Sequence, residues 1–396
     1  MLPHVNRPGT IVVGSDFKAL GVVRSLGRRG IKSIVIDNTP RSAWYSRYVT
    51  RRIAWHGPLD DAAFLKFLLA IGEKYKLRGW LLLPTQDEAV ELVARNAPHL
   101  AECYRLVTPG WEVVRWATDK RLTYQMAEEQ GIPYPRTWYP KDEHELATIQ
   151  FPFPVILKPA ISVRLQYATR LKALPATNST ELLEHYRALT RIIAPDEIMV
   201  QEIIPGGGKT QFSVATYCKD GQILLHMTAR RSRQYPIDYG LGSSFVEALE
   251  VPTISEHAAK LLSFMRVSGM VEVEFKQDTR DQQYKLLDIN IRPWGWHTLC
   301  IACGLDFPYI EYCDTLGEKP PSLQPRYDYH WIRMITDLPA GLQEMRAGLT
   351  TPGAYIRSLL GKTDFSVLDW RDPLPVVWDS LSVLIRAVKG LRRRRE

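Results

Sequence analysis

Cysteine is scarce in this sequence. The chain has five cysteines in 396 residues, an odd number: Cys103, Cys218, Cys300, Cys303 and Cys313. A disulfide framework is therefore excluded as the basis of the fold, and we expect free thiols in a reducing compartment, the cytoplasm. Cys300 and Cys303 form a C-x-x-C pair in an apolar stretch with no second pair nearby. Because a structural zinc site needs about four ligands, a packed helix is the main alternative to metal or redox use.

Long apolar runs are also missing. No segment reaches the roughly 18 residues that a membrane-spanning helix needs. The N-terminal residues MLPHVNRPGTIVVG lack the apolar core of a signal peptide, so we expect neither feature. The apolar and charged fractions, 45% and 24%, are those of an ordinary globular protein. Since 396 residues are too many for one compact core, we expect two or three domains.

Acidic residues are slightly outnumbered, 43 against 51 basic ones, for a net charge of +8. Much of the excess lies after residue 385, where six Lys and Arg accompany one Glu. The remainder is only mildly basic, so we expect no nucleic-acid partner. Residues 377–396 combine apolar side chains at helical spacing with this basic end. Such a helix can lie on the anionic inner face of a membrane, and the alternative is a terminal helix docked on the protein body.

Strand, turn and helix patterns alternate in the first hundred residues. The segments TIVVGSDFKALGVVRSLGRRGIKSIVID and WLLLPTQDEAVELVARN both show the pattern, which is typical of a parallel α/β sheet. Gly14 and Gly21 do not complete a dinucleotide-binding G-x-G-x-x-G. Pro84, Thr85, Gln86 and Asp87 follow the later strand, at the edge where such sheets bind ligands. Contact with a substrate and a helix cap are both open for these four residues.

Acids alternate with apolar residues in two later segments, MVEVEFKQD and QYKLLDINIR, which a polar turn separates. The pattern predicts a β-hairpin. Because side chains alternate between the faces of a strand, Glu272 and Glu274 share a face, as do Asp288 and Asn290. Antiparallel pairing can bring Glu274 beside Asp288 and Asn290. These oxygen donors suit Mg²⁺, which completes its shell with water and phosphate oxygens; the alternative is a solvent-facing hairpin.

The order of these segments resembles the ATP-grasp superfamily. In that family a lysine opens a helix and a second lysine ends a strand, and Lys120 in TDKRLTYQMAEEQGIPYPRT and Lys158 in PFPVILKP match them. The segment MVQEIIPGG resembles the hinge strand that holds adenine. VEVEF and LLDINIRPWG resemble the paired metal-binding strands. The likeness covers roughly residues 9 to 318.

The resemblance implies an α/β and α+β fold in four parts. A Rossmann-like, pre-ATP-grasp parallel sheet domain is expected over residues 1–112. The small ATP-grasp subdomain is expected over 113–200 and the large one, with the metal site, over 201–320. A helical C-terminal extension with the basic tail follows over 321–396.

The resemblance also implies the cofactors and the site residues. ATP and one or two Mg²⁺ ions are expected, with Mn²⁺ as a substitute. The implied nucleotide-binding residues are Lys120, Lys158, Gln201, Glu202, Ile204 and Gln211. The implied metal ligands are Glu274, Asp288 and Asn290. Arg292, two residues beyond Asn290, is expected near the transferred phosphate. Arg230, Arg231 and Arg233 can hold a carboxylate or the γ-phosphate, with Arg230 and Arg233 as the expected site residues, unless they form a solvated basic surface.

Two features depart from the family pattern. Relatives have a glycine-rich loop after the second lysine, whereas this loop reads AISVRLQYATR and has only Arg164 and Arg170 as charges for the phosphates. Asp288 stands where relatives usually have glutamate. Both features favour the alternative of a weakly active or non-catalytic homologue.

Within the superfamily, DINIRPWGWH and SRQYPIDYGLGSSFVE are most similar to carboxylate–amine ligases related to D-aspartate ligase. This implies ATP-dependent activation of a carboxylate as an acyl phosphate and its joining to an amine, on a small-molecule or cell-envelope-type substrate. The expected partners are those two substrates, and a homodimer is compatible with the pattern. The alternative is a nucleotide-binding homologue with a regulatory or membrane-associated adaptor role.

Overall fold

The computed structural model describes residues 7–161, 173–238, 242–319 and 322–382. Its N-terminal sheet is parallel, in the order β3-β2-β1-β4-β5. The strands are β1 (Thr10–Val13), β2 (Ser33–Asp37), β3 (Val49–Ala54), β4 (Leu81–Pro84) and β5 (Arg105–Leu106). The helices are α1 (Phe17–Gly27), α2 (Ala62–Lys74), α3 (Asp87–Arg95) and α4 (Ala97–Ala101). The central strands β1, β2 and β4 are buried throughout, as expected for a parallel sheet covered on both faces.

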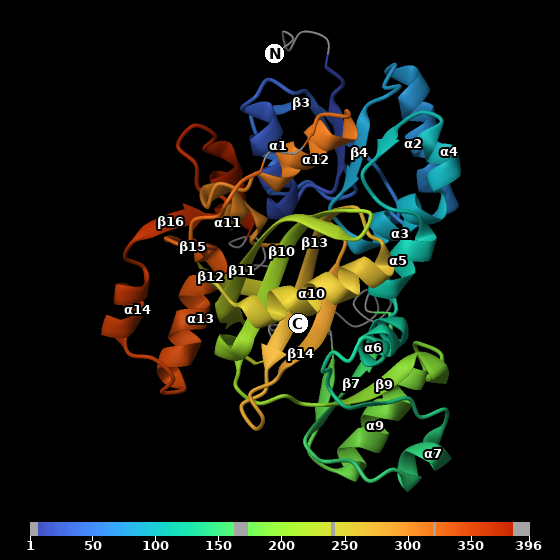
Figure 1. The fold of residues 1–396 in the computed structure, drawn as a ribbon, viewed down its shortest axis with the longest axis vertical. Helices are drawn as coiled ribbons and strands as arrows, with labels where there is room; N and C mark the ends of the chain where they lie inside the picture. The colour runs from blue at the N-terminus through green and yellow to red at the C-terminus, as the bar shows by residue number, and fades with distance from the viewer. Residues whose placement is uncertain (1–6, 162–172, 239–241, 320–321, 383–396) are drawn as a thin grey trace, which may run out of the picture.

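A small lobe follows at the opposite end of the molecule from α2 and α4 (Figure 1). Its four strands run in the order β6-β9-β7-β8. They are β6 (Thr137–Trp138), β7 (Val155–Pro159), β8 (Leu174–Ala176) and β9 (Ile198–Glu202), accompanied by α7 (Glu143–Thr148) and α9 (Ser179–Thr190). The helices α5 (Trp111–Thr118) and α6 (Lys120–Glu129) connect the N-terminal domain to this lobe.

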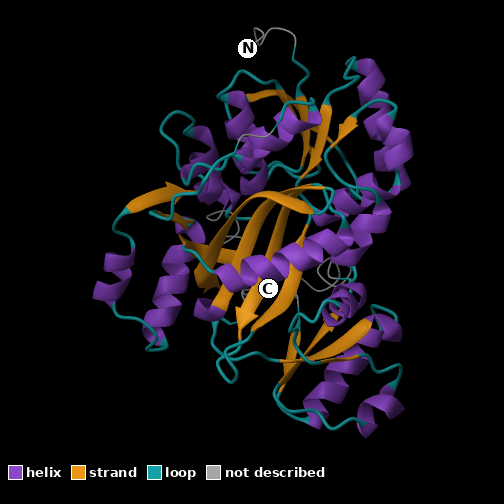
Figure 2. Ribbon diagram, in the orientation of Figure 1, coloured by secondary structure: helices purple, strands orange, loops and turns teal. Residues whose placement is uncertain are grey.

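The largest sheet has the order β14-β13-β10-β11-β12-β15-β16. Its strands are β10 (Gln211–Lys219), β11 (Gln222–Tyr235), β12 (Gly242–Ala248), β13 (Gly269–Gln277), β14 (Tyr284–Asn290), β15 (Tyr329–Ile332) and β16 (Lys362–Phe365). The helices are α10 (Pro252–Met265), α11 (His297–Ala302), α12 (Phe307–Thr315), α13 (Met334–Arg346) and α14 (Pro352–Ser358). Figure 2 shows this sheet in the middle of the molecule, between the two smaller ones. The expected fold class is confirmed, although the sequence did not reveal that β15 and β16 extend the sheet.

The predicted hairpin is β13 and β14, and its two faces differ sharply. Val273, Phe275, Leu286 and Ile289 are buried in the core that α10 covers. A register shift between Leu286 and Asp288 resets the alternation along β14. On the opposite face Glu274 pairs with Asp288 and Glu272 with Asn290. The apolar half of each strand therefore fixes which way its acids point.

The C-terminal extension returns to both larger domains. Arg233 of β11 forms a buried ion pair with Asp337 of α13, at 2.9 Å. Asp372 accepts a hydrogen bond from Arg24 of α1, also buried. In the helix over residues 374–382, Trp378 stacks on Tyr45 with ring centroids 4.4 Å apart. The helix is therefore docked on the body, as one of the two expectations had it.

The same helix exposes Leu374, Val377 and Leu381, which are spaced along its other face. The basic residues from Arg386 onward lie outside the described part of the chain. No helix within the described residues is long and apolar enough to cross a membrane.

All five cysteines are free thiols. Cys300 lies in α11 and Cys303 at its end, and both are buried. Burial raises the pKa of Cys303 to about 12, which leaves it a poor thiolate nucleophile or ligand. The structure therefore agrees with the packed-helix interpretation of this pair.

The buried pair between Arg233 and Asp337 should stabilise the protein strongly. Asp337 is fully buried and also accepts a hydrogen bond from Tyr355. Asp337→Asn leaves the Arg233 charge buried without a counter-ion, so we expect the free energy of unfolding to fall by about 3–5 kcal/mol. Urea denaturation measures this. Glu143→Gln, which breaks an exposed pair with Arg187, is the matched control and should change little; equal effects would contradict the prediction.

Candidate active site

The centre of the site is the polar face of the β13–β14 hairpin. The Asn290 amide donates hydrogen bonds to Glu272 Oε2 (3.1 Å) and to Glu274 Oε1 (3.2 Å). Gln211, on β10, donates to Glu274 Oε2 at 2.7 Å. The structure thus brings together all three predicted metal ligands and one of the predicted nucleotide-binding residues.

Lys120 joins this cluster from the first turn of α6. Its Nζ lies 2.7 Å from Asp288 Oδ1, and its side chain is buried. Although burial alone would lower the pKa of Lys120, Asp288 raises it. Lys158 on β7 is close enough for the two lysine charges to interact, and burial together with Lys120 lowers the pKa of Lys158. Two ammonium groups therefore face the acidic hairpin from different elements.

Glu272 was not assigned a role from the sequence, yet it lies in the same cluster. Its carboxylate accepts hydrogen bonds from Asn290 and from the Trp296 indole (2.8 Å). Burial, and then the neighbouring charge of Glu274, raise the pKa of Glu272 well above its usual value. The alternation of acids on β13 was the available signal for this residue. Its burial was not visible in the sequence.

The residues of the predicted adenine hinge have other partners in this structure. Gln201 is buried and donates to the Thr137 hydroxyl at 2.8 Å. Ile204, three residues further along the chain, is also buried. Glu202 lies 2.8 Å from Arg280 and 3.2 Å from Lys285, across the turn of the hairpin. Burial alone would raise the pKa of Glu202, but these partners and the Arg136 N–H lower it. The adenine-binding roles remain predictions.

A β-bulge sorts the three arginines of β11. Arg230 lies opposite Glu247, and Arg233 lies opposite Phe245, with a register shift between Arg231 and Arg233. Glu247 and Phe245 are two residues apart on β12, so Arg230 and Arg233 share a face. Arg231 points to the other face, where its Nη2 lies 3.3 Å from Glu274 Oε2.

Arg230 and Arg233 therefore lie apart from the carboxylate cluster. Arg230 pairs with Glu247 at 3.0 Å and Arg233 with Asp337. Their predicted roles in holding a substrate anion remain predictions. The sequence offered no way to prefer Arg231 over Arg230 and Arg233, because the bulge that selects it has no residue signature.

Arg292 is held between two domains. Its Nε and Nη2 donate to Asp87 Oδ1 (2.6 Å) and Oδ2 (2.9 Å), and Nη2 also donates to Asn290 Oδ1 at 2.9 Å. Asp87 is the first residue of α3 in the N-terminal domain. The sequence placed Asp87 only among residues that either cap a helix or meet a substrate. Thr85 does not cap that helix, because its hydroxyl donates to Val13 O.

The donor set fits Mg²⁺. Within the described residues, no group of three or more His, Cys, Asp or Glu side chains is placed to hold a metal ion. The predicted trio instead has two carboxylates and one amide, Glu274, Asp288 and Asn290, on facing strands. All are hard oxygen donors, and Mg²⁺ commonly takes only one or two carboxylates and fills its shell with water and phosphate oxygens. Arg164 and Arg170, in the loop without glycine, lie outside the described residues.

Three large side chains shortly after the hairpin are part of the core. Trp294, Trp296 and His297 are buried, and the two indoles lie 5.6 Å apart. The structure shows both indoles packed in the core with α11 and α12.

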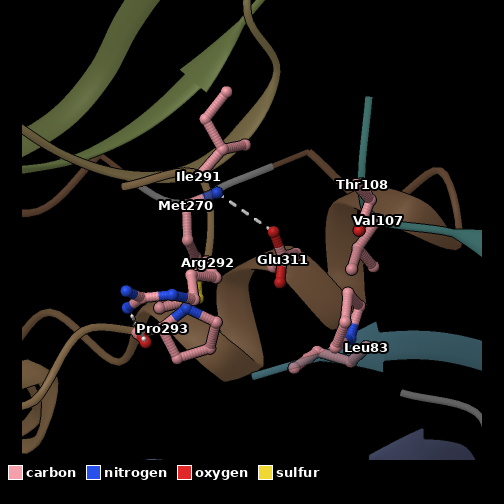
Figure 3. A pocket seen from close by; sticks show the side chains of 9 residues that line it. Leu83, Val107, Thr108, Met270, Ile291, Arg292, Pro293 and Glu311 are labelled. Atoms are coloured by element: carbon pink, nitrogen blue, oxygen red, sulfur yellow. Dashed lines mark hydrogen bonds between the residues drawn. The ribbon is translucent and has the colours of Figure 1, made fainter. Parts of the chain in front are cut away.

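A small cavity lies beside Arg292, between the N-terminal domain and the largest sheet. Figure 3 shows Arg292 and Pro293 on one side of it and Leu83 and Val107 on the other, with Glu311 between them. Its volume is about 10 Å³, roughly the room of one water molecule. It is therefore too small to be the substrate site.

Glu311 of α12 makes stability depend on pH. It is buried and accepts a hydrogen bond from the Met270 N–H at 3.0 Å. Burial raises the pKa of Glu311 to about 8. Because the folded state holds this proton more tightly than the unfolded chain, its stabilising contribution is complete below the usual Glu pKa and is lost as pH rises to about 8.

Glu311→Gln should therefore flatten the pH dependence of stability. One unit of pKa difference corresponds to about 1.4 kcal/mol, so the fall in unfolding free energy from about pH 5 to about pH 9 should shrink by a few kcal/mol. Denaturation series across this range give the slope. Glu318→Gln, which alters a half-exposed carboxylate, is the control. The same slope in wild type and Glu311→Gln would contradict the prediction.

The three-sheet architecture and the lysine–carboxylate cluster resemble those expected of an ATP-grasp protein. Residues 194–335 match the family model described as "ATP-grasp in the biosynthetic pathway with Ter operon". The chain is 25% identical over 325 residues to D-aspartate ligase of Enterococcus faecium (strain Aus0004), across 78% of this chain and 77% of that protein.

Two solved structures share the fold. The L-amino acid ligase from Bacillus licheniformis has a TM-score of 0.61 and 14% identity, over 81% of this chain and 78% of its own. The biotin carboxylase domain of the Hydrogenobacter thermophilus 2-oxoglutarate carboxylase, solved with MgADP, ADP and bicarbonate, has a TM-score of 0.64 and 15% identity, over 82% and 74%. The predicted resemblance to ATP-grasp proteins is confirmed, as is the predicted class of enzyme, an ATP-dependent ligase.

Proposed function

We propose that this protein activates a carboxylate with ATP and Mg²⁺ and joins it to an amine, with release of ADP and phosphate. The observation that carries the proposal is the convergence of Lys120, Asp288, Glu274 and Asn290 on one polar face, with Lys120 only 2.7 Å from Asp288. The D-aspartate ligase and L-amino acid ligase relatives support the carboxylate–amine class. A small-molecule or cell-envelope-type substrate is proposed on the same ground.

In this proposal the acidic residues and the cationic residues of the site have different roles. Glu274, Asp288 and Asn290 would hold the metal, and bound Mg²⁺ would neutralise phosphate charge. Lys120 and Lys158 supply point charges for phosphate oxygens. Arg231 and Arg292 flank the acidic face and can orient an anionic group. Phosphoryl transfer depends mainly on such positioning and charge neutralisation.

The test supplies ATP, Mg²⁺ and pools of amino acids and other carboxylates, and follows ADP, phosphate and product mass. We expect ADP release that requires both an acid and an amine. Asp288→Asn and Lys158→Ala should each lower it at least about a hundredfold, since both remove charges that act on the transferred phosphoryl group.

Lys66→Ala, at an exposed position of α2, is the matched control and should keep wild-type rates. Nucleotide binding without ADP release under every pool would reject the ligase proposal and favour the non-catalytic homologue. Wild-type rates in Asp288→Asn would reject the assigned site.

Peripheral contact with an anionic membrane through residues 377–396 is a separate proposal. It is supported by the exposed face of Leu374, Val377 and Leu381 and by the basic sequence that follows. We expect the full chain, but not one ending at Ser382, to sediment with phosphatidylglycerol vesicles and not with phosphatidylcholine vesicles. The shorter chain keeps the Trp378 stack on Tyr45. Equal sedimentation of both chains would end the proposal.

A further inference from the structure

The contact between Asp87 and Arg292 is bidentate and joins two domains. Both Asp87 oxygens accept from the side of the guanidinium formed by Nε and Nη2. This fork arrangement is the geometry in which a carboxylate fixes both the position and the plane of an arginine. The two residues are 205 positions apart in sequence, so no local element imposes it.

Arg292 is also tied to the predicted metal cluster. Its Nη2 donates to Asn290 Oδ1, while the Asn290 amide nitrogen donates to Glu272 and Glu274. A chain of hydrogen bonds therefore runs from Asp87 through Arg292 and Asn290 to the acidic hairpin. Nη1 makes one long contact with Pro293 O, 3.3 Å. With four of its five N–H groups accounted for in this way, the guanidinium is fixed, and its Nη1 edge is the part left to meet an anion.

A second cation lies near this pair. Lys18, at the start of α1, pairs with Asp16 at 3.4 Å and interacts electrostatically with both Arg292 and Asp87. The Arg292 side chain is 13% exposed and the Asp87 side chain 53% exposed. Asp87 and Asp16 therefore both offset the repulsion between Lys18 and Arg292.

From this geometry we infer that Asp87 is a positioning residue for the ligase reaction, acting through Arg292. It aligns the guanidinium with Asn290 and the hairpin carboxylates, so that the N-terminal domain completes the site for the transferred phosphoryl group. The inference rests on the proposed function. Arg292 is the residue that meets the anion, and Asp87 acts on it through the bidentate pair.

The kinetic test is a double-mutant cycle on carboxylate-dependent ADP release. We expect Asp87→Asn to lower kcat about 10- to 100-fold, because a displaced catalytic group is costly, with KM for ATP changed less than about twofold. In an Arg292→Ala background, Asp87→Asn should have no further effect. Asp87→Glu should recover part of kcat. Glu91→Gln, on the same helix and paired with Arg95, is the control.

A spectroscopic test needs no substrate. In ¹⁵N-arginine-labelled protein, the Arg292 Nε–H signal, assigned with Arg292→Lys, should be protected from exchange in wild type and Glu91→Gln and unprotected in Asp87→Asn. An unchanged Arg292 signal in Asp87→Asn would overturn the inference. So would a loss of kcat from Asp87→Asn in the Arg292→Ala background that is as large as its loss in the wild-type background. Absence of ADP release from wild type would instead reject the proposed function, and the signal would then decide the inference alone.

Discussion

The pairing of β13 with β14 is the constraint on which the site depends. One face of this pair is apolar and lies in the core under α10, so the other face has to carry Glu274 and Asp288 opposite each other. A slip of one residue in register would bury the acids and expose the apolar side chains. The hydrophobic effect, not attraction between polar groups, therefore places like charges together. Lys120 and Arg231 then supply opposite charges that make the arrangement tolerable.

The site is assembled from elements far apart in the sequence. Lys120 comes from α6, Lys158 from the small lobe, Glu274 and Asp288 from the largest sheet, and Asp87 from the N-terminal domain. Each contributes a charge at the end or edge of a rigid element. This arrangement suits a reaction in which holding charges in place matters more than covalent chemistry by the protein.

The parts of the site that the sequence predicted are those with a local pattern. The alternation of acids on two strands predicted Glu274 and Asp288, and a lysine at the start of a helix predicted Lys120. Both patterns can be recognised from neighbouring residues in the sequence. The bulge that turns Arg231 inward, and Arg230 and Arg233 outward, has no such pattern. The partnership of Arg292 with Asp87 is equally invisible, since it depends on how two domains dock. The strands β15 and β16 were not predicted because they are short, and their pairing depends on the rest of the folded sheet.

The contact between Arg24 and Asp372 bears on the order in which the chain can fold. Arg24 is buried in the N-terminal domain, and the aspartate that neutralises it lies 348 residues further on. During synthesis at 5–20 residues per second, that partner would emerge roughly 20 to 70 seconds later. The Ser46 hydroxyl also lacks its acceptor until Asp372 is synthesised, since it donates to Asp372 Oδ2 at 2.7 Å. The first domain to leave the ribosome is therefore among the last to be completed, and a fragment limited to its own residues would expose a cation meant to be buried.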